Sequence, residues 1–145
     1  MRKRLGKGLD IDDDTLAACV GARHRLGQQF EEHVLANSDI VVLPVMPITT
    51  PTMVRCDPAS DSFSGRTLYA LSRWTRFVNL LGFPAVAMPA GFDENGMPVG
   101  VQIVGRTGSD VALLELVRNV QNMTNWHARI PDAVVHLFPK SEALA

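Results

Sequence analysis

The sequence is short of lysine, and its serines never stand next to one another. Its only lysines are Lys3, Lys7 and Lys140, so residues 8–139 contain none. No Gly-x-Ser-x-Gly sequence is present to place a serine nucleophile on a strand-to-helix turn. No Gly-x-x-x-x-Gly-Lys-Ser/Thr sequence is present to bind phosphate. These absences argue against a nucleophile-elbow hydrolase and against a P-loop nucleotidase.

Cysteine and histidine are also sparse. Cys19 and Cys56 are too few for a disulfide framework and favour a reducing compartment. The four histidines stand in no His-Glu-x-x-His pattern, and the cysteines in no Cys-x-x-Cys pattern, so we expect no metal site and no cofactor. Cys19 falls on a predicted helix face and is expected in the core, whereas Cys56 falls in a predicted loop.

Neither charge nor hydropathy predicts a nucleic-acid or membrane partner. The formal net charge is −1 over 145 residues, so no basic surface is indicated. The apolar runs are far shorter than the roughly 20 residues that span a bilayer. The basic first residues have no apolar segment behind them, so we expect no secretory signal and a cytoplasmic location.

Residues 84–105 predict a β-hairpin rich in proline and glycine. Two apolar runs, residues 84–92 and 97–105, flank a polar segment that contains Asn95 and Gly96, and Asn-Gly is a strong hairpin signal. Proline cannot donate a hydrogen bond to a neighbouring strand. We therefore expect the three prolines of this region at strand ends or bulges: Pro84, Pro89 and Pro98.

Apolar periodicity predicts helices on both sides of this hairpin. The first is an amphipathic helix that ends before residues 37–39, with one apolar face made of Leu16, Cys19, Val20, Leu26, Phe30 and Val34. Residues 66–81 predict one or two short helices after a loop over residues 48–65. The last helix has an apolar face made of Leu113, Leu116, Val117, Val120, Met123 and His127.

Residues 40–43 are four consecutive apolar residues, which is typical of a strand buried on both faces. Such a strand belongs to a sheet with helices on its sides, so we expect an α/β fold. The length of 145 residues corresponds to one domain.

Two segments outside the hairpin could carry chemistry. His127 has no nucleophile or base paired with it, so we interpret it as a packed or helix-terminal residue. Residues 105–109 join a strand to a helix and include Gly105 and Gly108, which could bind phosphate at a helix N-terminus. A plain strand-to-helix turn is favoured, because the full Gly-x-Gly-x-x-Gly sequence is missing.

Four segments of the chain carry a pattern when they are taken in order. The first is residues 25–30 followed by Asp39, the apolar strand and the prolines at 44 and 47. The second, residues 73–91, has the form Arg-x-Thr…Asn-x-x-Gly-x-Pro-Ala…Pro-x-Gly, and the third, residues 96–105, has the form Gly-x-Pro-x-Gly-x-Gln. The fourth is Leu113 and Leu114 with residues 126–131. Together they resemble the C-terminal part of the amidase signature enzymes, which are serine hydrolases of amide bonds, over nearly the whole chain.

The resemblance implies a mixed β-sheet flanked by helices and a Ser–Ser–Lys triad that acts on a small-molecule amide. The triad belongs to the N-terminal part of the family's chain, so residues 1–145 are expected to be a single, incomplete domain with no catalytic residue and no activity alone. We expect it to need the missing N-terminal part of the amidase fold, or else to self-associate. By resemblance, Met46, Ser72 and Thr75 form part of the wall of the substrate pocket.

The resemblance also bears on the substrate. In glutamyl-tRNA amidotransferase A subunits, a branch of the family, an aspartate seven positions before the asparagine of the second segment helps hold the amino group of glutamine. Here that position is Ser72, seven before Asn79. The expectation is a general amidase for uncharged acyl groups.

Two alternatives remain open from sequence. One is a free-standing, non-catalytic α/β module that binds a partner or small ligand through its exposed sheet. The other is a phosphate-binding α/β domain that uses residues 105–109.

Overall fold

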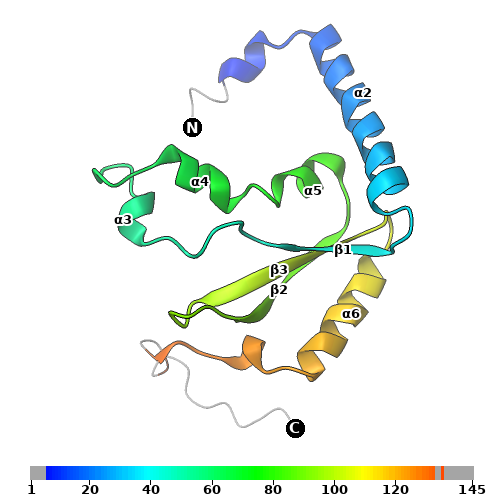
Figure 1. Ribbon diagram of the computed structural model, residues 1–145. Coiled ribbons are helices and arrows are strands. Elements are labelled where there is room, and N and C mark those ends of the chain that lie inside the picture. The colour runs from blue at the N-terminus through cyan, green and yellow to red at the C-terminus, as the bar shows by residue number, and fades with distance from the viewer. Residues whose placement is uncertain (1–5, 133–134, 136–145) are drawn as a thin grey trace.

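The computed structural model describes residues 6–132 and residue 135. Its centre is a three-stranded sheet of β1 (Ile40–Pro44), β2 (Ala85–Phe92) and β3 (Pro98–Gly105), in the order β1-β3-β2 (Figure 1). Helices pack on both faces of this sheet, which confirms the predicted α/β class. The three strands pair antiparallel throughout.

The predicted hairpin is present, and its turn is held by an aspartate. The Asp93 carboxylate accepts hydrogen bonds from the backbone amides of Asn95 and Met97, each at 2.9 Å. Gly96 has φ +74°, a conformation that glycine adopts without steric penalty. The prolines stand where the missing donor is tolerated: before β2, at the start of β3, and beside the bulge between Pro89 and Phe92 on the edge strand.

One face of the sheet packs against α6 (Asp110–Asn122). Met88 of β2 and Ile103 of β3 meet Leu113 and Val117 of the helix, and all four side chains are buried. Val86 and Val101, two positions before Met88 and Ile103, pack on the same cluster, and the spacing of four puts Leu113 and Val117 on one face of the helix. This cluster is the larger of the two cores.

The opposite face of the sheet carries a second, aromatic core. The side chain of Val104 is fully buried there. It packs against Val78 of α5 (Arg76–Leu81) and against Phe83, which follows that helix. Phe30 lies on this cluster, with its ring centroid 4.9 Å from that of Phe83. Two shorter helices precede α5 in the chain, α3 (Met53–Cys56) and α4 (Gly65–Leu71). The predicted loop over residues 48–65 therefore includes one helical turn, which ends at Cys56.

The predicted N-terminal helix is α2 (Asp13–Gln29), preceded by the 3₁₀ turn η1 (Lys7–Asp10) and continued by the π-helical turn η2 (Phe30–Val34). The Leu35 amide donates to the Phe30 carbonyl at 3.1 Å, an i→i+5 bond. In an α-helix, residues five apart point about 140° away from each other. The wider π turn brings Phe30 and Leu35 closer to one face, and Leu35 is fully buried.

Three expectations about burial are wrong. The apolar face of α2 is largely exposed and Cys19 lies in solvent, because no described element covers that face. The strand at residues 40–43 is not buried on both faces, and Val42 is 56% exposed. The last helix ends at Asn122, so His127 lies in the separate turn η3 (Trp126–Ala128) and is exposed.

Candidate functional site

The junction between α4 and α5 holds two of the predicted pocket residues, Ser72 and Thr75. The helix α4 ends at Leu71, and the carbonyl oxygen of Ser72 then accepts hydrogen bonds from the amides of Thr75, at 3.3 Å, and Arg76, at 3.2 Å. The Thr75 hydroxyl and the Arg76 Nε also donate to this oxygen, each at 3.3 Å. The junction is therefore fixed through the backbone of Ser72 rather than through its hydroxyl.

A hydrogen bond from Gln102 connects this junction to the sheet. The side-chain Nε2 of Gln102 donates to the Trp74 carbonyl at 2.7 Å, although the two residues are 28 positions apart. Gln102 is only 3% exposed, so this hydrogen bond is shielded from water. The signal for this role is a single polar residue within an otherwise apolar strand, because a buried amide needs a partner.

The loop after β1 forms three adjoining hollows with α3, α4 and the hairpin. They have volumes of about 240, 470 and 530 Å³, and Ile48 lines all of them. Met46 lines the smallest, beside Asp93 of the hairpin turn. Ser72 and Thr75 are not among the lining residues of these hollows, but their neighbours Arg73 and Arg76 line the largest.

The largest hollow is cationic. Arg66, Arg73 and Arg76 line it, and no ion pair joins them to a carboxylate within residues 6–132. Arg76 is held in place, since its guanidinium donates to the Tyr69 carbonyl at 3.3 Å and stacks on the Tyr69 ring at 5.6 Å. Arg73 lies 5.5 Å from the centre of the Trp74 ring. A positively charged group would be repelled from this region.

The segment at residues 105–109 has a structural role. The Arg106 guanidinium donates to the carbonyls of Leu35 and Ser38, and the Thr107 hydroxyl donates to the Glu31 carboxylate at 3.0 Å. The Thr107 amide also faces that carboxylate, at 3.4 Å. A carboxylate of this chain therefore already occupies donors that a phosphate would use, and the contacts tie η2 to the end of β3.

Two negative findings apply to the described part of the chain. It contains no group of three or more histidine, cysteine, aspartate or glutamate residues that could hold a metal ion. No helix among residues 6–132 is long and apolar enough to cross a membrane.

Comparison with known proteins assigns the chain to a family. The sequence model of the Amidase family matches residues 10–114, which include β1, both short helices of the junction and the hairpin. The chain therefore belongs to the amidase family.

Its curated relatives include A subunits of glutamyl-tRNA(Gln) amidotransferase. The subunit from Bordetella petrii is 32% identical over 111 residues, which are 75% of this chain and 20% of that protein. The subunit from Nitrosococcus oceani is 36% identical over 109 residues, 75% of this chain and 21% of that protein. The chain thus spans about a fifth of the length of the curated relatives it matches.

Solved structures of a hydrolase, an amidase and an amidotransferase A subunit contain a similar fold. A 6-aminohexanoate cyclic dimer hydrolase aligns with a TM-score of 0.69 and 27% identity, over 86% of this chain and 27% of that chain. A structure described as an amidase aligns with a TM-score of 0.63 and 32% identity, over 79% of this chain and 26% of that one. The glutamyl-tRNA(Gln) amidotransferase A subunit from Thermotoga maritima aligns with a TM-score of 0.52 and 28% identity, over 77% of this chain and 24% of that chain.

Proposed function

We propose that the chain is the C-terminal portion of an amidase that hydrolyses carboxamides to an acid and ammonia or an amine. One observation carries this proposal: the Amidase family matches residues 10–114, yet residues 8–139 hold no lysine and the chain has no adjacent serines. The family's reacting groups, a serine activated through a second serine by a neutral lysine, thus have no counterpart here. The remainder of the amidase fold supplies them, together with the backbone amides that stabilise the oxyanion.

In this proposal the chain contributes structure and one wall of the substrate pocket. Met46 lines a hollow of about 240 Å³ beside the hairpin, and the junction with Ser72 and Thr75 is fixed to the sheet through Gln102. A rigid junction supports this role, because a substrate wall must hold its geometry to position the amide.

The acyl group is proposed to be uncharged, and glutamine is not the ammonia donor. At Ser72 a neutral hydroxyl replaces the carboxylate expected of an amidotransferase A subunit, and a hydroxyl forms no charge-assisted pair with an ammonium group. The loss corresponds to about 1.5–3 kcal/mol, roughly ten- to a hundredfold in affinity. The guanidinium groups of Arg73 and Arg76 beside the junction further disfavour an ammonium group.

Reconstitution tests the proposal. The chain is mixed with the remainder of the cyclic dimer hydrolase, produced without the segment that aligns with this chain, and the hydrolase's own segment serves as the positive control. Hydrolysis of a phenylacetamide that needs both parts, and that disappears when the nucleophilic serine of the added part is mutated, is the expected result. Failure of this chain where the control segment succeeds contradicts the proposal, and so does a clear preference of the mixture for glutamine.

A further inference from the structure

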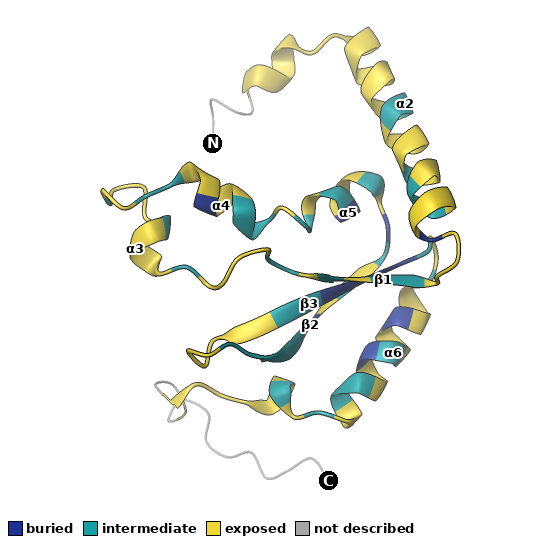
Figure 2. Ribbon diagram, in the orientation of Figure 1, coloured by how far each residue is buried: buried dark blue, intermediate teal, exposed yellow. Residues whose placement is uncertain are grey.

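The helix α2 presents an apolar face that the described chain leaves largely uncovered. None of the residues of α2, Asp13–Gln29, is buried. On the predicted apolar face Leu16 is 56% exposed, Val20 45% and Leu26 49%. Figure 2 shows α2 exposed over most of its length. The C-terminal end of the helix reaches the body, where Phe30, the residue after α2, packs against Phe77 and Phe83 with tilted rings.

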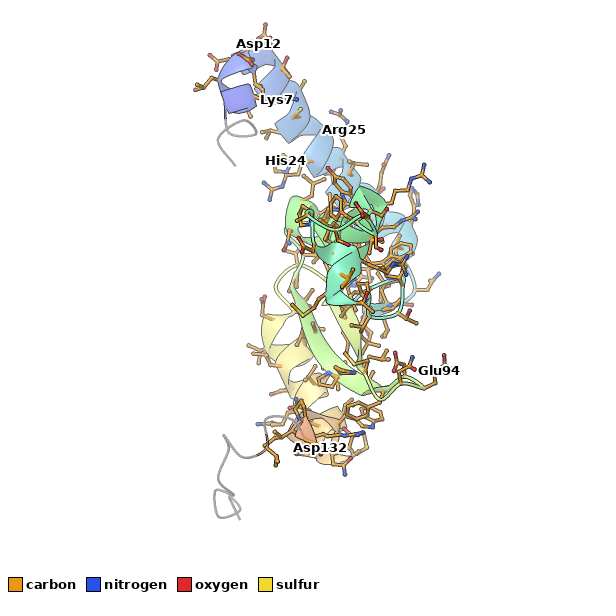
Figure 3. The ribbon with its side chains drawn as sticks, turned by 90° about the vertical axis from the view of Figure 1, so that its left-hand side faces the viewer. Lys7, Asp12, His24, Arg25, Glu94 and Asp132 are labelled. Carbon is orange, nitrogen blue, oxygen red and sulfur yellow. The ribbon has the colours of Figure 1, made fainter. Side chains whose placement is uncertain are left out.

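The position of α2 leaves this face open over most of its length. Lys7 and Asp12, next to the N-terminal end of α2, lie at the opposite end of the molecule from Asp132 (Figure 3). The helix thus extends beyond the sheet in both views (Figures 1 and 3). In proteins, most of the stability of a helix comes from tertiary packing of its amphipathic face rather than from helix propensity. The apolar face of α2 is therefore expected to have a packing partner.

The strand β1 is open in a similar way. It pairs with β3 on one side, and no described strand pairs with its other edge. Residues 40–43 of this strand are four consecutive apolar residues, but Val42 is 56% exposed. An open apolar strand edge is a site for further strand pairing.

We propose that the apolar face of α2 (Leu16, Val20 and Leu26) is the surface on which the catalytic remainder of the amidase fold packs, while the free edge of β1 continues its sheet. This inference rests on the proposed function. The size of the relatives supports it: the aligned segment is 20% of the curated relative and 27% of the hydrolase chain, whose structure keeps this fold over 86% of this chain. About four fifths of the curated relative and nearly three quarters of the hydrolase chain therefore lie outside the aligned segment and are available to cover these surfaces.

A second copy of the chain fits less well. Two copies that paired through β1 would satisfy the strand edges but would leave the apolar face of α2 in water. The sequence pattern of β1 is that of a strand covered on both faces, which an edge-to-edge dimer does not provide. A single large partner meets both requirements.

The test compares two double variants that add the same charge to α2. Leu16→Glu with Val20→Glu places carboxylates on the apolar face, and His24→Glu with Gln28→Glu places them on the polar face. Circular dichroism first checks that both keep the helix. Binding to the remainder of the cyclic dimer hydrolase, with the hydrolase's own segment as reference, is then measured by isothermal titration.

We expect the apolar-face variant to bind at least roughly a hundredfold more weakly than the unmodified chain, because two apolar side chains lose their buried contacts. The polar-face variant should bind within about threefold of it. If the unmodified chain binds and restores hydrolysis but the two variants bind equally well, the surface is wrong and the proposed function stands. If the unmodified chain does not bind where the reference segment does, the proposed function fails with it.

Sedimentation of the chain alone tests whether a second copy of the chain, rather than the amidase remainder, covers the apolar face of α2. Self-association that the apolar-face variant abolishes, with binding to the hydrolase remainder unchanged, assigns this face to a second copy and overturns the proposal. Binding that only the apolar-face variant loses supports it.

Discussion

Gln102 and Trp74 form a hydrogen bond that joins the α4–α5 junction to the central strand, with 2.7 Å between Nε2 and the carbonyl oxygen. The bond runs from the middle of β3 to the turn that carries Ser72 and Thr75. It explains why a polar side chain occupies a buried position in an apolar strand. The wall of the proposed pocket therefore depends on the hairpin for its position.

Replacing Gln102 by leucine tests this link. The change keeps the side-chain volume but leaves the Trp74 carbonyl without its donor, so we expect a loss of about 1–3 kcal/mol in the free energy of unfolding. Urea denaturation followed by circular dichroism measures it, with Gln28→Leu on the exposed side of α2 as control. Equal stability of the two variants would show that the hydrogen bond does not hold the junction.

The close packing of β3 on α6 at Gly105 leads to a second prediction. A Cβ at this position would overlap Ser109 Oγ and lie 3.3 Å from both methyl groups of Leu113. Gly105→Ala should therefore lower the free energy of unfolding by about 1–3 kcal/mol, and Ser109→Ala in the same chain should restore part of it. Gly27→Ala is the control, because nothing lies within 4 Å of its added Cβ and alanine favours a helix. A Gly105→Ala chain as stable as the Gly27→Ala chain contradicts this packing.

The start of α2 should respond to acid. Asp12 caps the helix, and the 2.6 Å hydrogen bond from the Thr15 amide lowers the pKa of its carboxyl below the ordinary value of 3.8. Because the folded pKa is depressed, the capping contribution is complete above the ordinary value and is lost as the pH falls through the folded one.

Helicity measured between pH 6 and pH 2 should thus decrease at the low end. The decrease should be smaller in Asp12→Asn, since asparagine also caps helices but does not titrate. An identical acid response in both chains would mean that another group controls it.

Ser72 allows a direct test of the proposed acyl preference. In the reconstituted enzyme Ser72→Asp should increase glutamine hydrolysis relative to an apolar amide by roughly ten- to a hundredfold, because a carboxylate can pair with the ammonium group. Ser62→Asp, in the exposed loop before α4, is the matched control. An unchanged ratio would place Ser72 outside the substrate pocket.

The sequence predicts the elements of this fold better than their burial. Asn95 and Gly96 set the hairpin turn, and the three prolines fall where a strand tolerates them, because these are local rules of backbone geometry. Cys19 and Val42 are exposed although the apolar pattern predicts burial. In our proposal the apolar patterns around Cys19 and Val42 reflect packing against the rest of the amidase fold, of which this chain is only a part.

In the candidate site, too, the sequence predicts local features better than contacts between distant residues. A single polar residue in β3 marks Gln102, but its partner is a backbone carbonyl 28 residues away that no local pattern identifies. The hydrogen bond between Thr107 and Glu31 joins residues 76 positions apart. Local sequence patterns do not identify such a contact, because it forms only when the two segments meet in the folded chain. Met46 lines a hollow beside the hairpin, and its place in the wall of a substrate pocket stays a prediction from the family resemblance.

If this chain is part of an amidase fold without its reacting groups, the isolated chain has no amidase activity, which an assay can measure. The purified 145-residue protein is assayed against aliphatic amides, aromatic amides and anilides at a concentration that would detect very slow turnover. We predict no hydrolysis above the buffer rate. Turnover that survives repeated purification and is lost on mutating a residue of this chain would contradict the account.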